Sequence, residues 1–557
     1  MQSNPHCLRK TEVGQGDWLP VSQEHDVTES DDVPEQAKRR RTFAIISHPD
    51  AGKSTLTEAL ALHAGLISEA GAIHGKASRK STVSDWMQLE KDRGISVNSA
   101  ALQFPYRDCV LNLLDTPGHA DFSEDTYRVL AAVDCAIMLI DAAKGLEQQT
   151  LKLFEVCRHR GIPIITVINK WDRPGKDALA LMDEIAQRIN LEPRPLTWPV
   201  GIAGDFRGVI ERSSGEFIQF TRTAGGATIA PEQRMSPADA LATAGDAWSA
   251  AAEEEELLSL DSDGLDYAAF LAGRQTPVLF ASAGLNFGVG QLLDTLIDLA
   301  PSPEPIVDAA GEPRPLDSEF SAMVFKVQAG MDPSHRDRVA FARVCSGRFD
   351  RGMHLTDAET GKTFAAKYVN AVVGRERRTM ETAYPGDIIG LVNAGSLRAG
   401  DTLYQNKRVM YPDMPRFAPE HFAVITSRDA GNSKRFGKGI AALDHEGVVQ
   451  VLTSETRGVQ SPIFAAVGPL QFDVAANRME VDFHAPININ HLEYRIARRV
   501  APEHAATVGG YLGAEIAQRS DGAFLALLVD KWRIERILRE NPDVTLDSLV
   551  GDDETAS

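Results

Sequence analysis

Cysteine is rare in this chain of 557 residues. No two cysteines form a C-x-x-C pair and their number is odd, so the sequence predicts neither a disulfide framework nor a cysteine-based metal site. The 14 histidines also lack the spacing of zinc ligands. We expect reduced thiols that pack as small apolar side chains. The five cysteines are Cys7, Cys109, Cys135, Cys157 and Cys345.

Long apolar runs are missing as well. No uninterrupted apolar stretch approaches the ~20 residues that span a membrane. The first segment, MQSNPHCLRKTEVGQGDWLP, has no apolar core of a secretory signal. We therefore expect no membrane partner and a cytoplasmic location.

Positive charge is in deficit: the formal net charge is −20. Such a surface is not expected to bind DNA or another polyanion non-specifically. Local basic patches can still contact phosphates, because only a few arginines and lysines are needed. Net charge therefore does not decide whether RNA is a partner.

The beginning of the chain has few large apolar side chains. Residues 1–41 are polar and acidic and end in KRRR (38–41). Such a segment buries too little surface to offset its ordering entropy, so we predict a flexible N-terminal extension. The basic run is interpreted as a solvated charge run, with an RNA contact as the less favoured alternative.

From residue 42 onward, apolar runs alternate with amphipathic stretches, for example TFAIIS followed by KSTLTEALALHAG. Buried strands that alternate with helices predict an α/β domain with a mostly parallel sheet, here over residues 42–305. The pattern is interrupted at about 204–272, which we interpret as an insertion. Its acidic run EEEE (253–256) is expected to be a solvent-facing helix start and not a metal site.

The remaining chain has a different pattern of proline, apolar and turn residues. A proline-rich stretch predicts a linker over 306–319. Short strands separated by turn residues then predict a small β-barrel domain over 320–406. Mixed strands and helices predict an α+β third domain over 417–545, followed by a flexible tail over 546–557.

The stretch SHPDAGKST (47–55) nearly matches a phosphate-binding loop, G-x-x-x-x-G-K-[ST], but lacks its first glycine. A strand enters it and a helix leaves it, as such a loop requires. Lys53 is then expected to reach the β- and γ-phosphates and Ser54 to ligate Mg²⁺. Ser47 is tolerable in the first position because that glycine is not itself a ligand.

Three further motifs follow, each after an apolar strand. In LLDTPGH (113–119), Asp115 suits the metal side of a phosphoryl-transfer site, and Gly118 can present its N–H to a γ-phosphate. In NKWD (169–172), Asp172 can accept hydrogen bonds from N1–H and N2–H₂ of guanine, a donor pair that adenine lacks. Asn169 can bridge the base and the phosphate loop. The backbone of SAG (282–284) can face the guanine O6.

All four motifs stand where strands of an α/β sheet end, which is where such sheets bind ligands. Together they predict a site for GTP or GDP with Mg²⁺. The predicted nucleotide-binding residues are Ser47, His48, Pro49, Asp50, Ala51, Gly52, Lys53, Ser54, Thr55, Asp115, Thr116, Pro117, Gly118, His119, Asn169, Lys170, Trp171, Asp172, Ser282, Ala283 and Gly284.

The stretch SDWMQLEKDRGISV (84–97), followed by DTPGH, resembles the translational GTPases, whose phosphate loops commonly read H-x-D-x-G-K-[ST] as HPDAGKS does here. The resemblance implies that Ser96 ligates Mg²⁺ together with Ser54 and Asp115, and that His119 orients the attacking water. It also implies that Asp50 helps to hold a monovalent cation. No arginine is assignable as an internal finger, so we expect slow intrinsic hydrolysis that the ribosome stimulates.

Within that family, stretches such as MDPSHRDRVAF, AYPGDIIGL and AVGPLQFDV resemble the class II peptide chain release factors, over residues 42–540. This implies a monomeric GTPase that promotes dissociation of codon-reading release factors from the ribosome after peptide release. Arg336, Arg338 and the run 375–378 are candidate ribosomal RNA contacts, although a solvated surface is the favoured alternative.

Two other functions stay open. One is a translocase of the elongation factor G type, although that enzyme carries further domains after its third for which this sequence has no length. The other is a GTP-dependent switch that acts on a protein partner away from the ribosome.

Overall fold

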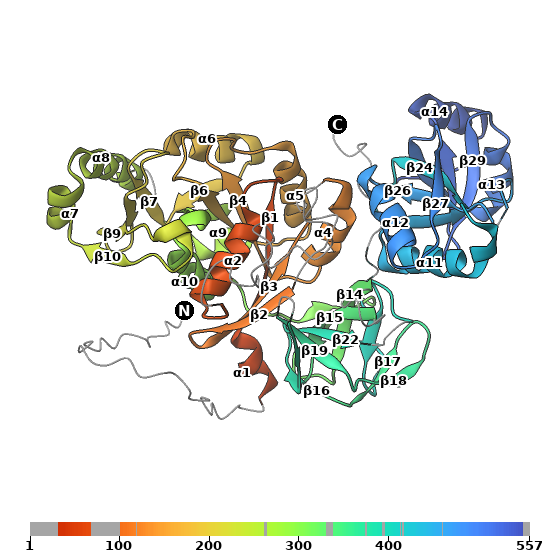
Figure 1. Ribbon diagram of the computed structural model, residues 1–557, viewed down its shortest axis with the longest axis horizontal. Coiled ribbons are helices and arrows are strands. Elements are labelled where there is room, and N and C mark those ends of the chain that lie inside the picture. The colour runs from red at the N-terminus through yellow and green to blue at the C-terminus, as the bar shows by residue number, and fades with distance from the viewer. Residues whose placement is uncertain are drawn as a thin grey trace.

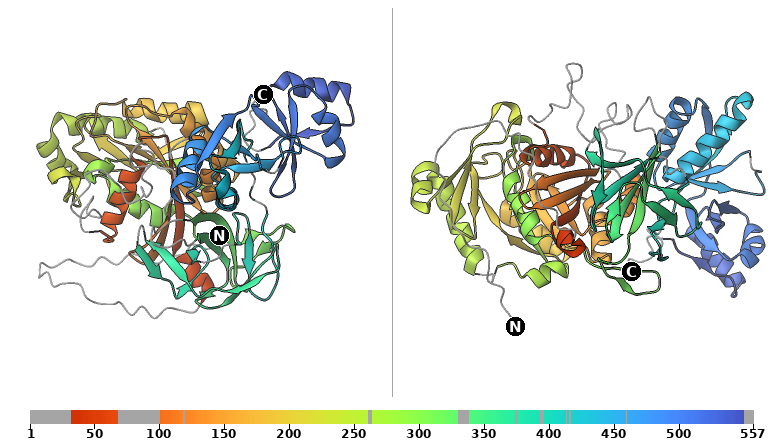
Figure 2. Two further views of the ribbon diagram at one scale, coloured as in Figure 1. Left: turned by 45° about the vertical axis from the view of Figure 1, so that its right-hand side comes forward. Right: turned by 90° about the horizontal axis from the view of Figure 1, so that it is seen from below.

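The computed structural model describes residues 32–67, 101–117, 120–260, 264–329, 338–373, 376–392, 396–412, 414, 417–458 and 460–549. Three bodies follow one another along the chain: an α/β domain, a barrel-like antiparallel domain and an α+β domain (Figure 1). The barrel-like domain contacts both of the others in every view (Figure 2). This is the fold class that the sequence predicts, and it is confirmed.

The first domain is built on a mostly parallel sheet with the strand order β2-β3-β1-β4-β5-β11-β6. Strand β1 pairs in parallel with β3 and β4, whereas β2 is antiparallel to β3. The inner strands β3, β4 and β5 are mostly apolar because both faces of the sheet are covered. The strands of this sheet are β1 (Arg40–Ser47), β2 (Ala101–Tyr106), β3 (Cys109–Asp115), β4 (Cys135–Asp141), β5 (Ile164–Asn169), β6 (Glu192–Pro195) and β11 (Gln275–Phe280).

Helices cover the two faces separately. Leu60 of α2 and Leu296 of α10 pack on one face, whereas Leu130 of α4, Phe154 of α5 and Leu181 of α6 pack on the other. The helices are α2 (Lys53–His63), α4 (Ser123–Leu130), α5 (Gln148–His159), α6 (Ala178–Ile189) and α10 (Val289–Leu299).

An additional layer interrupts this domain after β6. A four-stranded antiparallel sheet, in the order β10-β9-β8-β7, is followed by three helices, of which α7 and α8 pack on it and α9 packs on β11 of the main sheet. The elements are β7 (Thr197–Val200), β8 (Gly208–Glu211), β9 (Glu216–Phe220), β10 (Glu232–Met235), α7 (Pro237–Ala244), α8 (Asp246–Leu260) and α9 (Tyr267–Leu271).

The acidic run 253–256 lies in the second half of α8, so the prediction of a solvent-facing helix start is wrong. Glu254 accepts a hydrogen bond of 2.9 Å from the indole N–H of the buried Trp198, and Glu255 pairs with Arg212 at 3.1 Å. The contact with Trp198 explains why Glu254 is not fully exposed to solvent, because a buried N–H needs an acceptor.

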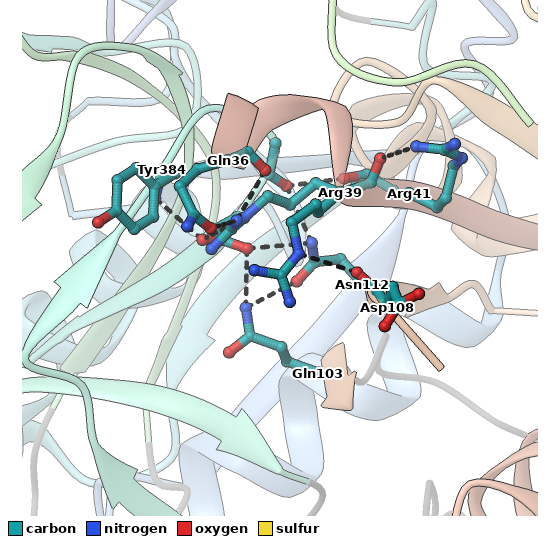
Figure 3. Close-up of polar contacts among 11 residues, drawn as sticks. Gln36, Arg39, Arg41, Gln103, Asp108, Asn112 and Tyr384 are labelled. Atoms are coloured by element: carbon teal, nitrogen blue, oxygen red, sulfur yellow. Dashed lines mark hydrogen bonds and ion pairs between the residues drawn. The ribbon is translucent and has the colours of Figure 1, made fainter. Parts of the chain in front are cut away.

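The predicted flexible extension up to residue 41 is wrong for residues 33–41. Residues Val33–Lys38 form α1, and β1 begins at Arg40. The basic run is therefore mostly structural and not a solvated charge run. Arg39 donates to the carbonyl of Asp108 at 2.9 Å (Figure 3). Arg41 donates to the carbonyl of Ile297 at 3.2 Å.

Arg40 forms a buried joint between the first domain and the barrel. Its Nε lies 3.1 Å from Asp387 Oδ2, and its guanidinium lies 4.7 Å from the centroid of the Tyr384 ring. Gln103 donates to Asp387 Oδ1 at 3.0 Å, while the backbone N–H of Tyr384 donates to Oδ2 at 2.9 Å (Figure 3). The carboxylate of Asp387 thus accepts from both domains.

Replacing Asp387 by asparagine should lower the free energy of unfolding by about 3–5 kcal/mol, because it leaves the buried Arg40 guanidinium without its counter-charge. Denaturant unfolding measures this change. The matched control is Glu35→Gln, which breaks the exposed Lys38–Glu35 pair and should leave stability unchanged. Equal effects of the two substitutions would contradict the role assigned to the joint.

The barrel-like domain has the strand order β18-β17-β23-β14-β15-β22-β19. Its sheet continues into the first domain because β19 pairs with β2 at Val373 and Leu102. The strands are β14 (Ser321–Ala329), β15 (Arg338–Ser346), β16 (Phe349–Asp350), β17 (His354–Asp357), β18 (Thr363–Ala365), β19 (Val369–Val373), β20 (Glu376–Thr379), β21 (Thr382–Ala383), β22 (Ile388–Val392) and β23 (Thr402–Tyr404).

The third domain has an eight-stranded sheet in the order β27-β24-β26-β25-β29-β30-β28-β31. Helices α11 and α12 share one apolar cluster, and α13 and α14 share another. None of the helices in the described part of the chain is long and apolar enough to cross a bilayer. The elements are β24 (His421–Ser427), β25 (Gln450–Thr453), β26 (Ile463–Ala466), β27 (Ile487–His491), β28 (Ile496–Val500), β29 (Ala514–Arg519), β30 (Phe524–Leu528), β31 (Leu546–Asp547), α11 (Ser433–Glu446), α12 (Leu470–Val481), α13 (Pro502–Gly509) and α14 (Lys531–Glu540).

Candidate nucleotide-binding site

The phosphate-binding loop connects the end of β1 to the start of α2. Gly52 stands at the N-cap of α2 with φ +99°, a conformation that favours glycine. No side chain among the described residues caps this helix start, and the N–H groups of a first helical turn suit an anion. Ser47 is the last residue of the extended β1, so the missing first glycine costs no strain there.

Replacing Gly52 by alanine should lower nucleotide affinity by about tenfold or more. A Cβ at this position would lie 2.5 Å from Asn169 Nδ2, and losing a hydrogen bond of that amide costs about 1–1.5 kcal/mol. The control is Gly65→Ala, because Gly65 also has a positive φ but nothing within 4 Å of its added Cβ. Nucleotide titration of both variants separates the contact from backbone strain, and an unchanged affinity of the Gly52 variant would contradict the prediction.

Lys53, the first residue of α2, carries a buried ammonium group. The residue is 7% exposed, and its Nζ has no hydrogen-bond partner within the part of the chain that the structure describes. Burial lowers the pKa of Lys53, and the nearby Asp115 carboxylate opposes this shift. A buried cation without a hydrogen-bond partner is costly, and bound phosphates can supply such partners at this loop.

Asp115 lies beside this loop, at the same edge of the sheet. It is the buried last residue of β3, and it pairs in register with Ile45 of β1. Thr116 donates its hydroxyl to the carbonyl of Ile45 at 2.6 Å, which fixes the chain after β3 against β1, and Pro117 is buried next to it. The sheet thus brings the phosphate loop and the Asp115 motif together.

The oxygen donors present fit Mg²⁺, which prefers oxygen ligands and is usually held by one or two carboxylates together with substrate phosphates. Ser54 on α2 and Asp115 on β3 are such donors. Among the described residues no three His, Cys, Asp or Glu side chains gather as a metal site. Ser96, Gly118 and His119 lie outside the described residues, and their roles stay predictions.

The other loop residues have different environments. His48 is buried with its Nε2 3.2 Å from Glu147 Oε2; burial lowers its pKa, and Glu147 opposes the shift. Asp50 adopts a positive φ of 65°, Ala51 is buried, and Thr55 is exposed on α2. Pro49, half-buried, precedes Asp50 in the turn.

Asn169 ties two loops together. Its Nδ2 donates to the carbonyl of Ala51 at 2.8 Å, and its Oδ1 accepts from the N–H of Ala283 at 2.9 Å. Lys170 donates to the carbonyl of Asp50 and pairs with Asp141 Oδ2 at 2.8 Å. Sequence reasoning missed Asp141, although its place at the end of β4, between the motif-bearing strands β1 and β5, is a usable signal.

The predicted guanine-specificity motif NKWD has a buried tryptophan, Trp171, and a half-buried aspartate, Asp172. Trp171 points into the core, where its ring lies 4.9 Å from that of Phe280, so its side chain supports the loop from beneath. Asp172 Oδ1 accepts from the hydroxyl of Ser282 at 2.6 Å. Ser282 therefore orients the carboxylate through its side chain, a role that the sequence did not reveal, while Gly284 is exposed in the same loop.

A phosphate loop, an aspartate at the end of β3, an N-K-x-D loop and an S-A-G loop meet at the carboxyl edge of one parallel sheet, which defines a P-loop GTPase domain. Residues 38–302 match the model of the Elongation factor Tu GTP binding domain. Residues 319–406 match Elongation factor G domain 2, and residues 411–538 match the Class II release factor RF3, C-terminal domain.

Relatives extend the match over nearly the whole chain. Peptide chain release factor 3 of Gloeobacter violaceus is 44% identical over 90% of this chain and 96% of its own length. Peptide chain release factor 3 of Symbiobacterium thermophilum is 44% identical over 92% of this chain and 98% of its own. The chain therefore belongs to the peptide chain release factor 3 family of GTP-binding translational GTPases.

The fold is also found in solved structures. The crystal structure of ttk003000868 from Thermus thermophilus aligns with a TM-score of 0.65 at 22% identity, covering 88% of this chain and 73% of that chain. At this identity the likeness concerns the fold alone.

The candidate RNA contacts are only partly described. Arg338 is the first residue of β15, and the run 376–378 belongs to β20. Arg336 and Arg375 lie outside the described residues, so the role of the whole set stays a prediction.

Proposed function

We propose that this release-factor GTPase is stimulated by the ribosome, and that its GTP form promotes dissociation of codon-reading release factors after peptide release. The observation that carries the proposal is the buried Lys53 ammonium beside the uncapped start of α2, in a chain whose third domain matches a release-factor family. We further propose that it acts as a monomer in the cytoplasm, with ribosomal RNA and proteins as its contacts.

Hydrolysis in this site is a matter of positioning and charge stabilisation. The N–H groups of 47–54 and the Lys53 ammonium hold the phosphates, and Asp172 with Ser282 selects guanine. Ser54, Asp115 and Ser96 would hold Mg²⁺, which when bound neutralises charge on the phosphate oxygens. His119 would orient the attacking water, and γ-phosphate contacts would order the segment around Gly118 until hydrolysis releases it.

Co-sedimentation with ribosomes, comparing a non-hydrolysable GTP analogue with GDP, tests the partner. We expect the analogue to favour ribosome binding. Binding that ignores the nucleotide, or no binding, would overturn the ribosomal role and favour a switch that acts on another protein.

A release-factor recycling assay on post-release ribosomes tests the role itself. Wild-type protein with GTP should speed departure of the codon-reading factor. His119→Ala should bind ribosomes but hydrolyse GTP far more slowly, by about 100-fold or more if it removes the water-orienting group. A variant with wild-type hydrolysis would contradict the role of His119.

A further inference from the structure

The loop that carries the SAG motif rests against the insertion that follows β6. The short helix η2 (Ala224–Gly226) lies between β9 and β10 and contacts the helical turn η3 (Ala283–Leu285). Gly226 is buried at this contact, and a Cβ added to it would lie 2.1 Å from the carbonyl oxygen of Gly284. The backbones of the two segments therefore touch at a place that only a glycine allows.

Asn286 joins the same two segments by hydrogen bonds. Its Nδ2 donates to the carbonyl of Gly226 at 2.6 Å and to the carbonyl of Thr228 at 3.3 Å. Asn286 is 1% exposed and has a φ of 61°, a conformation that asparagine adopts more readily than most residues. Hydrogen bonds that are shielded from water are strengthened, so this pair holds the two segments in a defined arrangement.

Aromatic rings from the insertion support the base of the loop. The backbones of Ser282 and Phe287 exchange two hydrogen bonds of 3.0 Å, which close the loop 282–287. The ring of Phe287 stacks on that of Phe220, the last residue of β9, with the ring centroids 5.0 Å apart. Phe206, between β7 and β8, lies 5.9 Å from Phe287. Such aromatic pairs stabilise the contact beyond their buried area.

The opposite side of this loop faces the NKWD motif. Asn169 accepts a hydrogen bond from the N–H of Ala283. Asp172 accepts one from the hydroxyl of Ser282. Gly284 is exposed beside them. The loop thus lies between the insertion and the predicted base site, and a shift of the Gly284 carbonyl would move the backbone that is predicted to face guanine O6.

We propose that Gly226 and Asn286 are positioning residues for guanine recognition, through which the insertion holds the SAG backbone at hydrogen-bonding distance from guanine O6. Hydrogen bonds weaken when their geometry departs from the preferred distance and angle. A loop that is fixed before the nucleotide arrives also has fewer conformations to lose on binding. The proposal rests on the proposed function, because it takes the SAG loop as the O6 contact of the GTPase. It adds that a layer behind this loop contributes to the choice of base.

The test compares Gly226→Ala with Gly225→Ala. Both glycines have a φ of +65°, but a Cβ added at Gly225 meets nothing within 4 Å. A difference between the two variants therefore reports the contact with Gly284 and not backbone strain. Affinities for GDP and for 6-thio-GDP are measured by titration with Mg²⁺, and folding is checked by thermal unfolding. The thio analogue keeps the N1–H and N2–H₂ groups of guanine and replaces only O6 by sulfur, a larger and weaker acceptor.

The wild type should prefer GDP to 6-thio-GDP. Gly226→Ala should lower this affinity ratio by about fivefold or more, because the displaced backbone no longer fits O6, whereas Gly225→Ala should leave the ratio unchanged.

Asn286→Gly is the second variant, because glycine adopts the same positive φ without strain and removes only the two hydrogen bonds to the insertion. It should lower the ratio in the same direction. Asn190→Gly is its control: Asn190 is exposed at the end of α6 with a φ of 50°, and its replacement should leave the ratio unchanged.

Equal losses of affinity for GDP and 6-thio-GDP, or an unchanged ratio in both Gly226→Ala and Asn286→Gly, would show that the insertion supports only the fold and would overturn the proposal. A wild type that binds the two nucleotides equally well would overturn it too. None of these outcomes bears on the ribosome, so the proposed function is tested separately by its own co-sedimentation experiment. Failure of the wild type to bind any guanine nucleotide would overturn both.

Discussion

Lys53→Met should lower nucleotide affinity by about 100-fold or more while leaving the nucleotide-free protein at least as stable as the wild type. The wild-type ammonium is buried and has no hydrogen-bond partner among the described residues, so its charge is a cost until phosphates approach. Contacts of a cation with phosphate oxygens are charge-assisted, and two of them contribute about 3 kcal/mol or more.

Methionine is suited to this test because it keeps the length and apolar stem of lysine and removes only the charge. Nucleotide affinity is measured by titration with fluorescent GDP and GTP analogues, and stability by thermal unfolding without nucleotide. Lys152→Met, on the exposed side of α5, is the control and should change neither quantity. A Lys53 variant that unfolds more readily but still binds nucleotide would show that the ammonium serves the fold and not the phosphates.

The architecture could be predicted because it depends on local patterns. The strands that precede the nucleotide motifs are mostly apolar, since helices cover both faces of the sheet. The same reasoning predicted that Asn169 contacts the phosphate loop, and its side chain donates to Ala51 of that loop; its second partner, Ala283, was not predicted.

Contacts between distant segments could not be predicted in this way. Arg40 looked like part of a solvated run because its partner, Asp387, lies in another domain. Neither spacing nor composition indicates that a barrel carboxylate neutralises that arginine. The hydrogen bond from the N–H of Leu470, the first residue of α12, to Asp121 could not be predicted either, because the two residues lie in different domains.

Strand β1 connects the Arg40–Asp387 contact with the phosphate loop. Arg40 at its start is fixed to the barrel, and Ser47 at its end begins the phosphate loop. A strand in the middle of a sheet is stiff, so the barrel is expected to keep a fixed position relative to the phosphates. The third domain instead contacts η1 (Ala120–Phe122) and α4, which follow the DTPGH motif. The two neighbouring domains thus contact different parts of the predicted nucleotide site.

Asp172→Asn should lower GTP affinity by roughly 100-fold or more and favour xanthine nucleotides. The wild-type carboxylate can accept from guanine N1–H and N2–H₂, and each charged hydrogen bond contributes about 1.5–3 kcal/mol. An asparagine keeps one acceptor and turns the other into a donor, which faces the guanine amino group unfavourably. Xanthine carries a carbonyl at that position and can accept from the new donor.

Ser282 sharpens the expectation, because its hydroxyl donates to Asp172 Oδ1 at 2.6 Å and fixes the orientation of the carboxylate. Competition between GTP and XTP for a fluorescent nucleotide measures the switch. Asp177→Asn is the matched control: Asp177 caps α6 through hydrogen bonds from Leu179 and Ala180, and asparagine is an equally good N-cap. An Asp172 variant with unchanged preference for GTP would mean that guanine is recognised elsewhere, because the loss of a charged acceptor pair cannot leave that selectivity intact.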